Sequence, residues 1–207
     1  MSFTPTKYEL KLTIDFDEKT FTGDAKIHVD VTDSVKEFDL KISRDLEIER
    51  ISFYQAAFVS RGHPHSIGET AGINVDKEND SVHVTLGNDI NSESIKEEGY
   101  IQVEYKGKMG ESDAVDGLHY SEGIKYEANL NTENVTSLLP ILEDIPLTVT
   151  LSVVTPYRAG VETNLQTGEH KSVNEQLFAN NFNSGDEKVL VSELKMMISA
   201  PTFLVLD

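Results

Sequence analysis

The sequence predicts an all-β protein, built as an antiparallel sandwich or a large twisted β-sheet. Three observations favour this fold class. Apolar and polar residues alternate with a period of two in many short runs, as they do in half-buried strands. Turn residues separate these runs. No run of about 11 residues shows a convincing helical period. Short strands separated by turns are typical of antiparallel sandwiches and large twisted sheets.

Two hairpins are predicted from neighbouring alternating runs. Residues 8–14 and 21–31 form the first, joined by the polar turn at 15–20. Residues 72–76 and 82–86 form the second, with residues 77–80 at its tip. The same reasoning predicts further strands at 38–42, 46–53, 100–105, 147–154, 176–181, 189–191 and 194–205.

Other segments are predicted as connections. Residues 62–72 are interpreted as a loop, and Gly168 as part of a turn. Pro201 interrupts the last predicted strand, because proline cannot donate a hydrogen bond to a neighbouring strand. The apolar side chains of that strand are nevertheless expected to be buried: Leu194, Met196, Ile198, Phe203 and Val205.

Length and charge limit the possible functions. The 207 residues can bury a sizeable core, and without repeats or linker-like stretches they are interpreted as one domain, 1–207. Thirty-six acidic against 18 basic residues give a net charge of −18. This charge excludes nucleic acid as an expected partner and disfavours anionic membranes, whereas it favours cationic ligands, including peptide amines. No apolar run reaches about 18 residues, so no membrane span is expected. Because the chain has no cysteine and no apolar leader, we expect a cytoplasmic location.

Motifs for catalysis and metal binding are not found. The zinc-protease H-E-x-x-H, the phosphate-binding loop, G-x-G-x-x-G and G-x-S-x-G are absent. His63 and His65 flank a proline, but a metal site needs more ligands converging on one point. Glu143 and Asp144 point apart in an extended chain, so a surface turn is favoured over an acid–base pair. We therefore assign no catalytic residue and no metal ligand within the chain.

The stretch from Thr132 to Leu151 is the main candidate for a binding loop. A polar lead-in, residues 126–131, is followed by the apolar run Leu138–Leu142, a turn at 143–146 and a β-rich run. This order predicts a loop pinned against the core, and loops on a rigid sheet often carry binding residues. An ordinary buried crossover is the alternative. We expect Leu139, Pro140 and Leu142 to be buried, with the polar residues before them exposed.

Several motifs resemble the first domain of the zinc aminopeptidases of the aminopeptidase N and puromycin-sensitive family. The chain opens with P-x-x-Y-x-L-x-L-x-x-D from Pro5, then F-x-G from Phe21, and Tyr105-Lys-Gly107 matches a Y-x-G strand end. Four further segments follow in the family order: Gly117–Ser121, Leu139–Leu151, Thr163–Asn164 and Ala200–Val205. The resemblance covers nearly the whole chain.

This resemblance implies a saddle-shaped β domain that precedes a thermolysin-like catalytic domain of the same polypeptide. The zinc of the parent enzyme and its ligands would then lie beyond Asp207. The resemblance also implies that a Q-x-E segment of this domain reaches the active site and holds the α-amine of the substrate. In this chain the Q-x-E positions fall on Asn129 and Asn131, so a neutral amide replaces the family's Glu. An alignment shifted by two residues gives the role to Glu133.

Two functions remain open from the sequence. The parent is a zinc aminopeptidase whose substrate cleft includes this domain, or it is a divergent relative that binds peptides or nascent chains with weak or no exopeptidase activity, as a translation-associated fungal member would. The missing Glu favours the second. A free-standing β scaffold unrelated to peptidases, with an immunoglobulin-like Greek key, is a third alternative.

Overall fold

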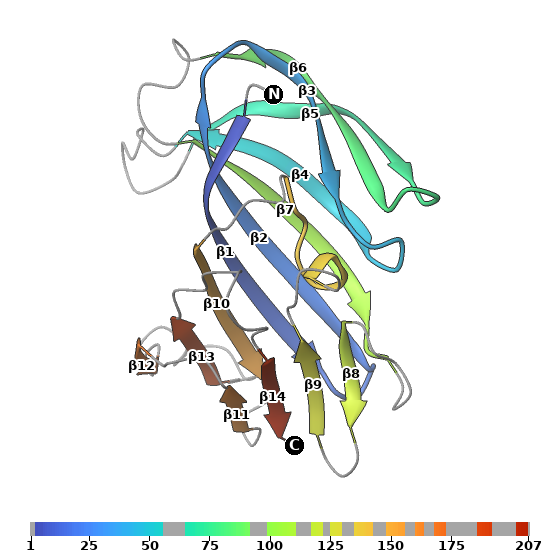
Figure 1. Ribbon diagram of the computed structural model, residues 1–207, viewed down its shortest axis with the longest axis vertical. Helices are drawn as coiled ribbons and strands as arrows, with labels where there is room; N and C mark the ends of the chain where they lie inside the picture. The colour runs from blue at the N-terminus through green and yellow to red at the C-terminus, as the bar shows by residue number, and fades with distance from the viewer. Residues whose placement is uncertain are drawn as a thin grey trace.

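The computed structural model of the chain describes residues 3–55, 65–91, 99–110, 117–121, 125–129, 135–142, 148–155, 160–163, 168–172, 186–191 and 202–206. The described residues form strands and one short 3-10 helix, which confirms the predicted all-β class. The described strands form two sheets, one of ten strands and one of four (Figure 1). The strands of the larger sheet, in spatial order, are β12 (Gly168–Ser172), β13 (Asp186–Val191), β10 (Thr148–Thr155), β1 (Phe3–Asp15), β2 (Thr20–Val31), β7 (Gly99–Lys108), β4 (Glu47–Gln55), β5 (His65–Asp76), β6 (Ser81–Ile90) and β3 (Val35–Lys41).

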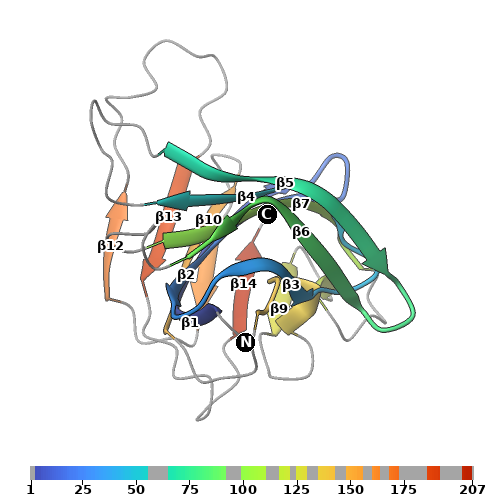
Figure 2. The same cartoon turned by 90° about the horizontal axis from the view of Figure 1, so that it is seen from above.

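The smaller sheet lies against one end of the larger one. Its strands, in spatial order, are β11 (Gly160–Thr163), β14 (Thr202–Leu206), β9 (Lys125–Asn129) and β8 (Leu118–Ser121). The 3-10 helix η1 (Val135–Ser137) follows β9, and its residue Thr136 accepts a backbone hydrogen bond of 3.0 Å from Ser43, which follows β3. Viewed from above, the larger sheet curls so that β3 and β6 cover the concave side of the sheet (Figure 2).

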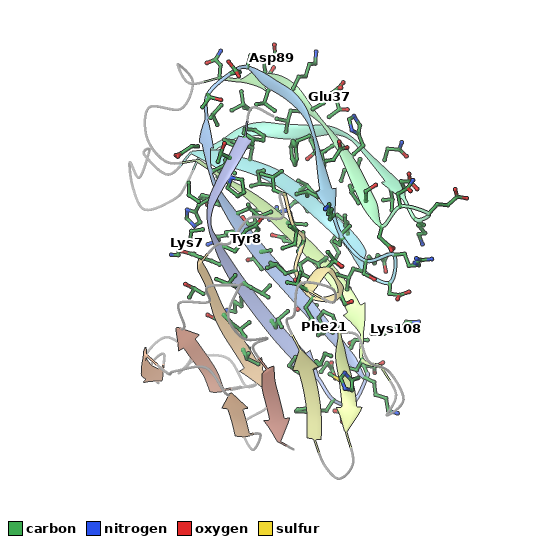
Figure 3. All side chains as sticks on the ribbon, in the orientation of Figure 1. Lys7, Tyr8, Phe21, Glu37, Asp89 and Lys108 are labelled. Atoms are coloured by element: carbon green, nitrogen blue, oxygen red, sulfur yellow. The ribbon has the colours of Figure 1, made fainter. Side chains whose placement is uncertain are left out.

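Alternation of side chains explains where the core lies. Along β1, Tyr8, Leu10 and Leu12 are fully buried, whereas the residues between them are partly or fully exposed. In Figure 3, Lys7 and Tyr8 extend to opposite sides of β1. Aromatic rings close the core between strands, since Phe3 stacks on Phe53 at a ring-centroid distance of 5.4 Å. One face of β1 is therefore packed into the core, and its opposite face carries polar residues.

Both predicted hairpins are confirmed. Strand β1 pairs antiparallel with β2, and β5 pairs with β6 around a turn at residues 77–80. The predicted strands at 38–42, 46–53, 100–105, 147–154 and 189–191 correspond to β3, β4, β7, β10 and β13. The predicted strand at 176–181 and the segment Leu194–Pro201 lie outside the described residues, and the side chains of β14, including Phe203 and Val205, are also outside the described part.

Three expectations were wrong or incomplete. Residues 65–72 belong to β5, because Gly68 and Glu69 pair with β4 although their sequence shows no alternation. Gly168 begins β12 and pairs with Val191, so it is not in a turn. Strands β8, β9 and β11 were not predicted, since each has only four or five residues. The larger sheet also contains a parallel pair, β1 with β10, in which Leu10 faces Leu151.

Candidate functional site

The predicted amine-binding residues lie at the end of β9 and in the connection between β9 and η1. Asn129 is the last residue of β9, where it pairs with Thr202 of β14. Asn131 and Glu133 lie outside the described residues, in the connection that ends at Val135. The position of their side chains therefore stays a prediction. Asn129 is fixed in the backbone of the smaller sheet, so one end of this connection is anchored.

The other end is anchored by the segment 135–142, which we call the anchored segment. The prediction that this segment is a loop held against the core is confirmed, because Leu139 and Leu142 are 1% and 5% exposed and Pro140 is buried. Its backbone makes a reciprocal pair of hydrogen bonds between Ile141 and Lys41, both of 2.8 Å. The amide of Ser43 donates to the carbonyl of Thr136 at 3.0 Å. The anchored segment is thus joined to the end of β3 by an isolated antiparallel bridge, with one more backbone hydrogen bond to Ser43.

Two buried tyrosines hold the anchored segment from below. The hydroxyl of Tyr105, on β7, donates to the carbonyl oxygen of Leu138. The hydroxyl of Tyr8, on β1, accepts a hydrogen bond of 3.0 Å from the amide of Leu142. Burial, and secondly the charge of Asp24, raises the pKa of Tyr105 far above its ordinary value, so its hydroxyl stays protonated at neutral pH. Each tyrosine thus joins the sheet to a loop through its buried hydroxyl, a role for which Tyr is suited.

Glycines opposite aromatic rings explain two of the sequence motifs. Gly23 on β2 pairs with Tyr105 on β7, and Phe21 on β2 pairs with Gly107 on β7. Each ring lies over the partner glycine: an added Cβ at Gly23 would be 2.1 Å from Cζ of Tyr105, and one at Gly107 would be 2.2 Å from Cζ of Phe21. Glycine is required at both positions because the rings occupy the space of a side chain. F-x-G and Y-x-G are therefore two halves of one packing unit, which places the Tyr105 hydroxyl under Leu138.

A third motif glycine lies beside η1. Gly117 has a φ of +71°, in the left-handed region that glycine adopts without steric cost. A Cβ at Gly117 would be 3.4 Å from Cβ of Ser137. The next residue, Leu118, is 1% exposed and its carbonyl accepts a hydrogen bond of 2.8 Å from Gly110. The G-L motif thus brings the start of β8 against the anchored segment.

A polar cluster on the opposite face of the sheet was not found from the sequence. Glu9 of β1 lies 2.6 Å from Nζ of Lys7 and 3.4 Å from Nε2 of His28. The His28 imidazole is the main influence that lowers the pKa of Glu9 to about 2, against the raising effect of burial and with further lowering by Lys7. An open hollow of about 180 Å³ adjoins Glu9 and is lined by both carboxylate and ammonium groups. Alternation along β1 places Lys7, Glu9 and Lys11 on this face, but the contact of Glu9 with His28 depends on the register with β2.

Metal binding has no support among the described residues. Within the described ranges, no group of three or more His, Cys, Asp and Glu side chains is placed to hold a metal ion. His83 contacts Asp39 at 2.8 Å, with Glu37 at 3.8 Å, on an exposed surface. His65 begins β5, and His63 lies outside the described residues. We therefore assign no zinc ligand among the described residues.

Comparison with protein families identifies the family of this chain. Residues 4–137 match the Peptidase M1 N-terminal domain. The chain belongs to this family. The matched range runs from the first strand of the M1 N-terminal domain to η1, so it includes the F-x-G and Y-x-G unit and Asn129. The resemblance to the aminopeptidase family is thereby confirmed over residues 4–137, and a β scaffold unrelated to peptidases is ruled out.

Two further findings complete the comparison. A search of curated proteins finds no match to the chain. In the part of the M1 N-terminal domain that the structure describes, no helix has the length and apolar character needed to cross a membrane.

Proposed function

We propose that this M1 N-terminal domain forms the part of a zinc aminopeptidase's substrate cleft that receives the N-terminus of a peptide, in a cytoplasmic enzyme. The observation that carries the proposal is the family match over residues 4–137, which includes every strand that supports the anchored segment from below. The catalytic domain of the same polypeptide supplies the zinc and the hydrolytic groups.

The proposed amine-binding residues are Asn129, Asn131 and Glu133. The anchored segment supports this assignment, because it fixes one end of their connection while β9 fixes the other. A ligand-binding loop needs such support, since misplacement by about 1 Å weakens recognition. Asn131 accepts a hydrogen bond from an ammonium group but adds no charge, and charge-assisted hydrogen bonds are about twice as strong as neutral ones.

The second candidate is a peptide-binding or nascent-chain-binding protein with weak or no exopeptidase activity. The specific observation in its favour is the neutral Asn131 at the position where the family has Glu. A weaker amine site reduces the selectivity for free N-termini that an exopeptidase needs. Hydrolysis of an aminoacyl amide by the zinc-loaded full-length protein separates the two candidates, since only the first predicts turnover.

The variant Asn131→Glu in the full-length protein tests the amine site. We expect peptides with a free N-terminus to bind more tightly by about 1–3 kcal/mol, the scale of a hydrogen bond to a charged group. N-acetylated peptides of the same sequence should be unaffected, because they carry no ammonium group. Isothermal titration calorimetry with both peptides gives the comparison.

The matched control is Glu133→Gln, which removes one charge two residues away. If Asn131 is at the amine site, Glu133→Gln should change the affinities for free and acetylated peptides equally. Equal effects of Asn131→Glu on both peptides, together with a selective loss for Glu133→Gln, would transfer the role to Glu133.

A further inference from the structure

Strand β5 changes its pairing partner at Thr70. Residues 65–69 pair with β4, ending at Glu69 opposite Ser52, and residues 70–76 pair with β6. The hydroxyl of Thr70 donates to the carbonyl of Ile51, which closes the β4 ladder. Beyond this point, the segment Gly72–Asp76 pairs with β6 on one side and with no described strand on the other. Figure 2 shows β5 as the outer strand of a hairpin that extends beyond the rest of the sheet.

Two apolar side chains stand along this open edge. Ile73 and Val75 are 40% and 46% exposed, the large hydrophobic residues that are exposed in the described part of the chain. They face Val84 and Val82 of β6, both of which are fully buried. Ile73 and Val75 therefore lie on the same face of the hairpin as these buried valines, but the core does not cover them. Single exposed apolar residues are ordinary, but alternating ones beside an unpaired strand edge form a template for another strand.

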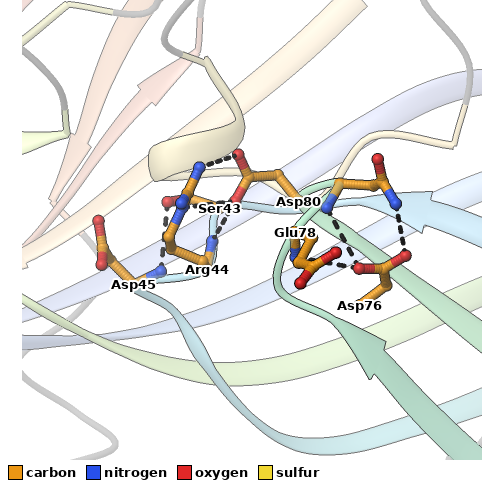
Figure 4. A network of polar contacts seen from close by, with 7 residues as sticks. Ser43, Arg44, Asp45, Asp76, Glu78 and Asp80 are labelled. Atoms are coloured by element: carbon orange, nitrogen blue, oxygen red, sulfur yellow. Dashed lines mark hydrogen bonds and ion pairs between the residues drawn. The ribbon is translucent and has the colours of Figure 1, made fainter.

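Hydrogen bonds and an ion pair hold the turn at the tip of the hairpin that carries the edge (Figure 4). The carboxylate of Asp76 accepts hydrogen bonds from the amide of Glu78 at 3.0 Å and from the side chain of Asn79 at 2.7 Å. Asp80 adopts a φ of +48° and binds Arg44 through both carboxylate oxygens, each at 3.1 Å. An edge whose turn is fixed loses little conformational entropy when it binds a partner strand.

The charge of the surroundings indicates the chemistry of that partner. Asp76 ends the open edge, Glu78 follows it, and both are exposed, whereas Arg44 offsets the charge of Asp80. Lys77 supplies a single basic side chain in this turn. The whole chain carries a net charge of −18, which disfavours a second copy on the same edge. A basic segment fits the edge better than an acidic one.

We propose that Gly72–Asp76 accepts an extended basic peptide segment by β-strand addition, with two apolar residues at alternate positions contacting Ile73 and Val75. Main-chain hydrogen bonds supply affinity in such complexes, and the alternate side chains supply specificity. Five residues of edge match a partner segment of about five residues, at roughly 3.3 Å per residue. This site needs no free α-amine, so it goes beyond the proposed amine-binding function and does not depend on it.

The test uses a dye-labelled peptide, acetyl-Lys-Lys-Val-Thr-Val-Lys-Lys-amide, and fluorescence anisotropy with the chain of 207 residues. Both ends are blocked, so that failure of the amine site leaves the result unchanged. Three comparison peptides accompany it: two with alternate backbone nitrogens methylated, one for each phase, and one with glutamate in place of every lysine. We expect at least tenfold weaker binding for one phase of methylation and for the glutamate peptide.

Variants of the edge complete the test. Ile73→Lys and Val75→Lys should each weaken binding of the lysine peptide at least tenfold. Asn74→Lys is the matched control, because it adds the same charge on the same strand but on the other face, and it should weaken binding less than threefold. All three positions are exposed, so the fold is expected to tolerate the changes. Circular dichroism confirms that each variant is folded.

Three results would overturn the proposal. The first is no binding of the lysine peptide at millimolar concentration. The second is equal binding of the parent peptide and both methylated peptides, which would indicate simple electrostatic attraction. The third is a dimer of the wild-type chain in analytical ultracentrifugation that Val75→Lys dissociates, which would assign the edge to a second copy.

Discussion

Replacing Gly23 with alanine tests the connection between the sheet and the anchored segment. The new methyl group would lie 2.1 Å from Cζ and 2.5 Å from the hydroxyl oxygen of Tyr105. Carbon atoms in contact prefer separations of about 3.5–4.0 Å, so the ring has to move by more than 1 Å. This movement takes the hydroxyl away from the carbonyl of Leu138, which is buried in the anchored segment.

The expected loss of stability has two contributions. Overpacking a tight core costs about 1–3 kcal/mol, and leaving a buried carbonyl without its donor costs about 1–3 kcal/mol. We therefore expect Gly23→Ala to lower the free energy of unfolding by about 2–6 kcal/mol, a large part of the roughly 5–15 kcal/mol typical of a domain. Urea denaturation, followed by the shift in midpoint at constant slope, measures this change.

The matched control is Gly72→Ala, the same substitution in a strand of the same sheet. An added Cβ there is 4.0 Å from its nearest neighbour, Cβ of Thr85, so we expect a change within about 1 kcal/mol and of either sign. Tyr105→Phe removes only the hydroxyl. Combined with Gly23→Ala, it should cost less than the sum of the single changes by about 0.5–3 kcal/mol, since both disrupt one contact. Additive costs, or a Gly23→Ala effect no larger than that of Gly72→Ala, would refute the reasoning.

Two further predictions concern the core and the polar face. Leu139→Ala should destabilise the chain by about 2–5 kcal/mol in urea denaturation, because Leu139 is 1% exposed; a loss below about 1 kcal/mol would show that the anchored segment is peripheral. Glu9→Gln should lower stability above pH 4.5, and the difference from wild type should shrink as the pH falls from 4.5 towards 2, since the folded pKa of Glu9 is lowered to about 2 from 4.5. A difference that is constant from pH 6 to pH 3 would contradict the contact with His28.

The fold class and both hairpins could be predicted because their information is local. Residues 8–14 alternate strictly, and one face of that strand is buried along its whole length. The parallel pairing of β1 with β10 could not be predicted, because alternation is the same in either strand direction and Leu10 and Leu151 are far apart in sequence. The start of β5 was missed for another reason. Gly68 and Glu69 enter the sheet through backbone pairing with β4, which leaves no hydrophobic pattern.

Likewise, only part of the candidate site could be predicted from the sequence. The burial of Leu139 and Leu142 followed from their composition, since an apolar run between polar segments has to be covered. The hydroxyl contacts of Tyr8 and Tyr105 did not, because each joins residues on distant elements. Asn131 and Glu133 entered through family resemblance alone, and their roles remain predictions that the binding experiments address.

The arrangement of these contacts determines how substitutions near Asn131 should be interpreted. The anchored segment is held by backbone bonds to β3 and by hydroxyl contacts to β1 and β7, none of which involves residues 130–134. Asn131→Glu therefore changes charge in a connection whose C-terminal support stays unchanged, and its effect on amine binding is electrostatic. Gly23→Ala has the opposite effect. It changes none of the polar residues of that connection, but it moves the Tyr105 hydroxyl that contacts the carbonyl of Leu138. If amine recognition depends on a fixed loop, both variants change the affinity for free N-termini, but only Gly23→Ala also lowers the free energy of unfolding.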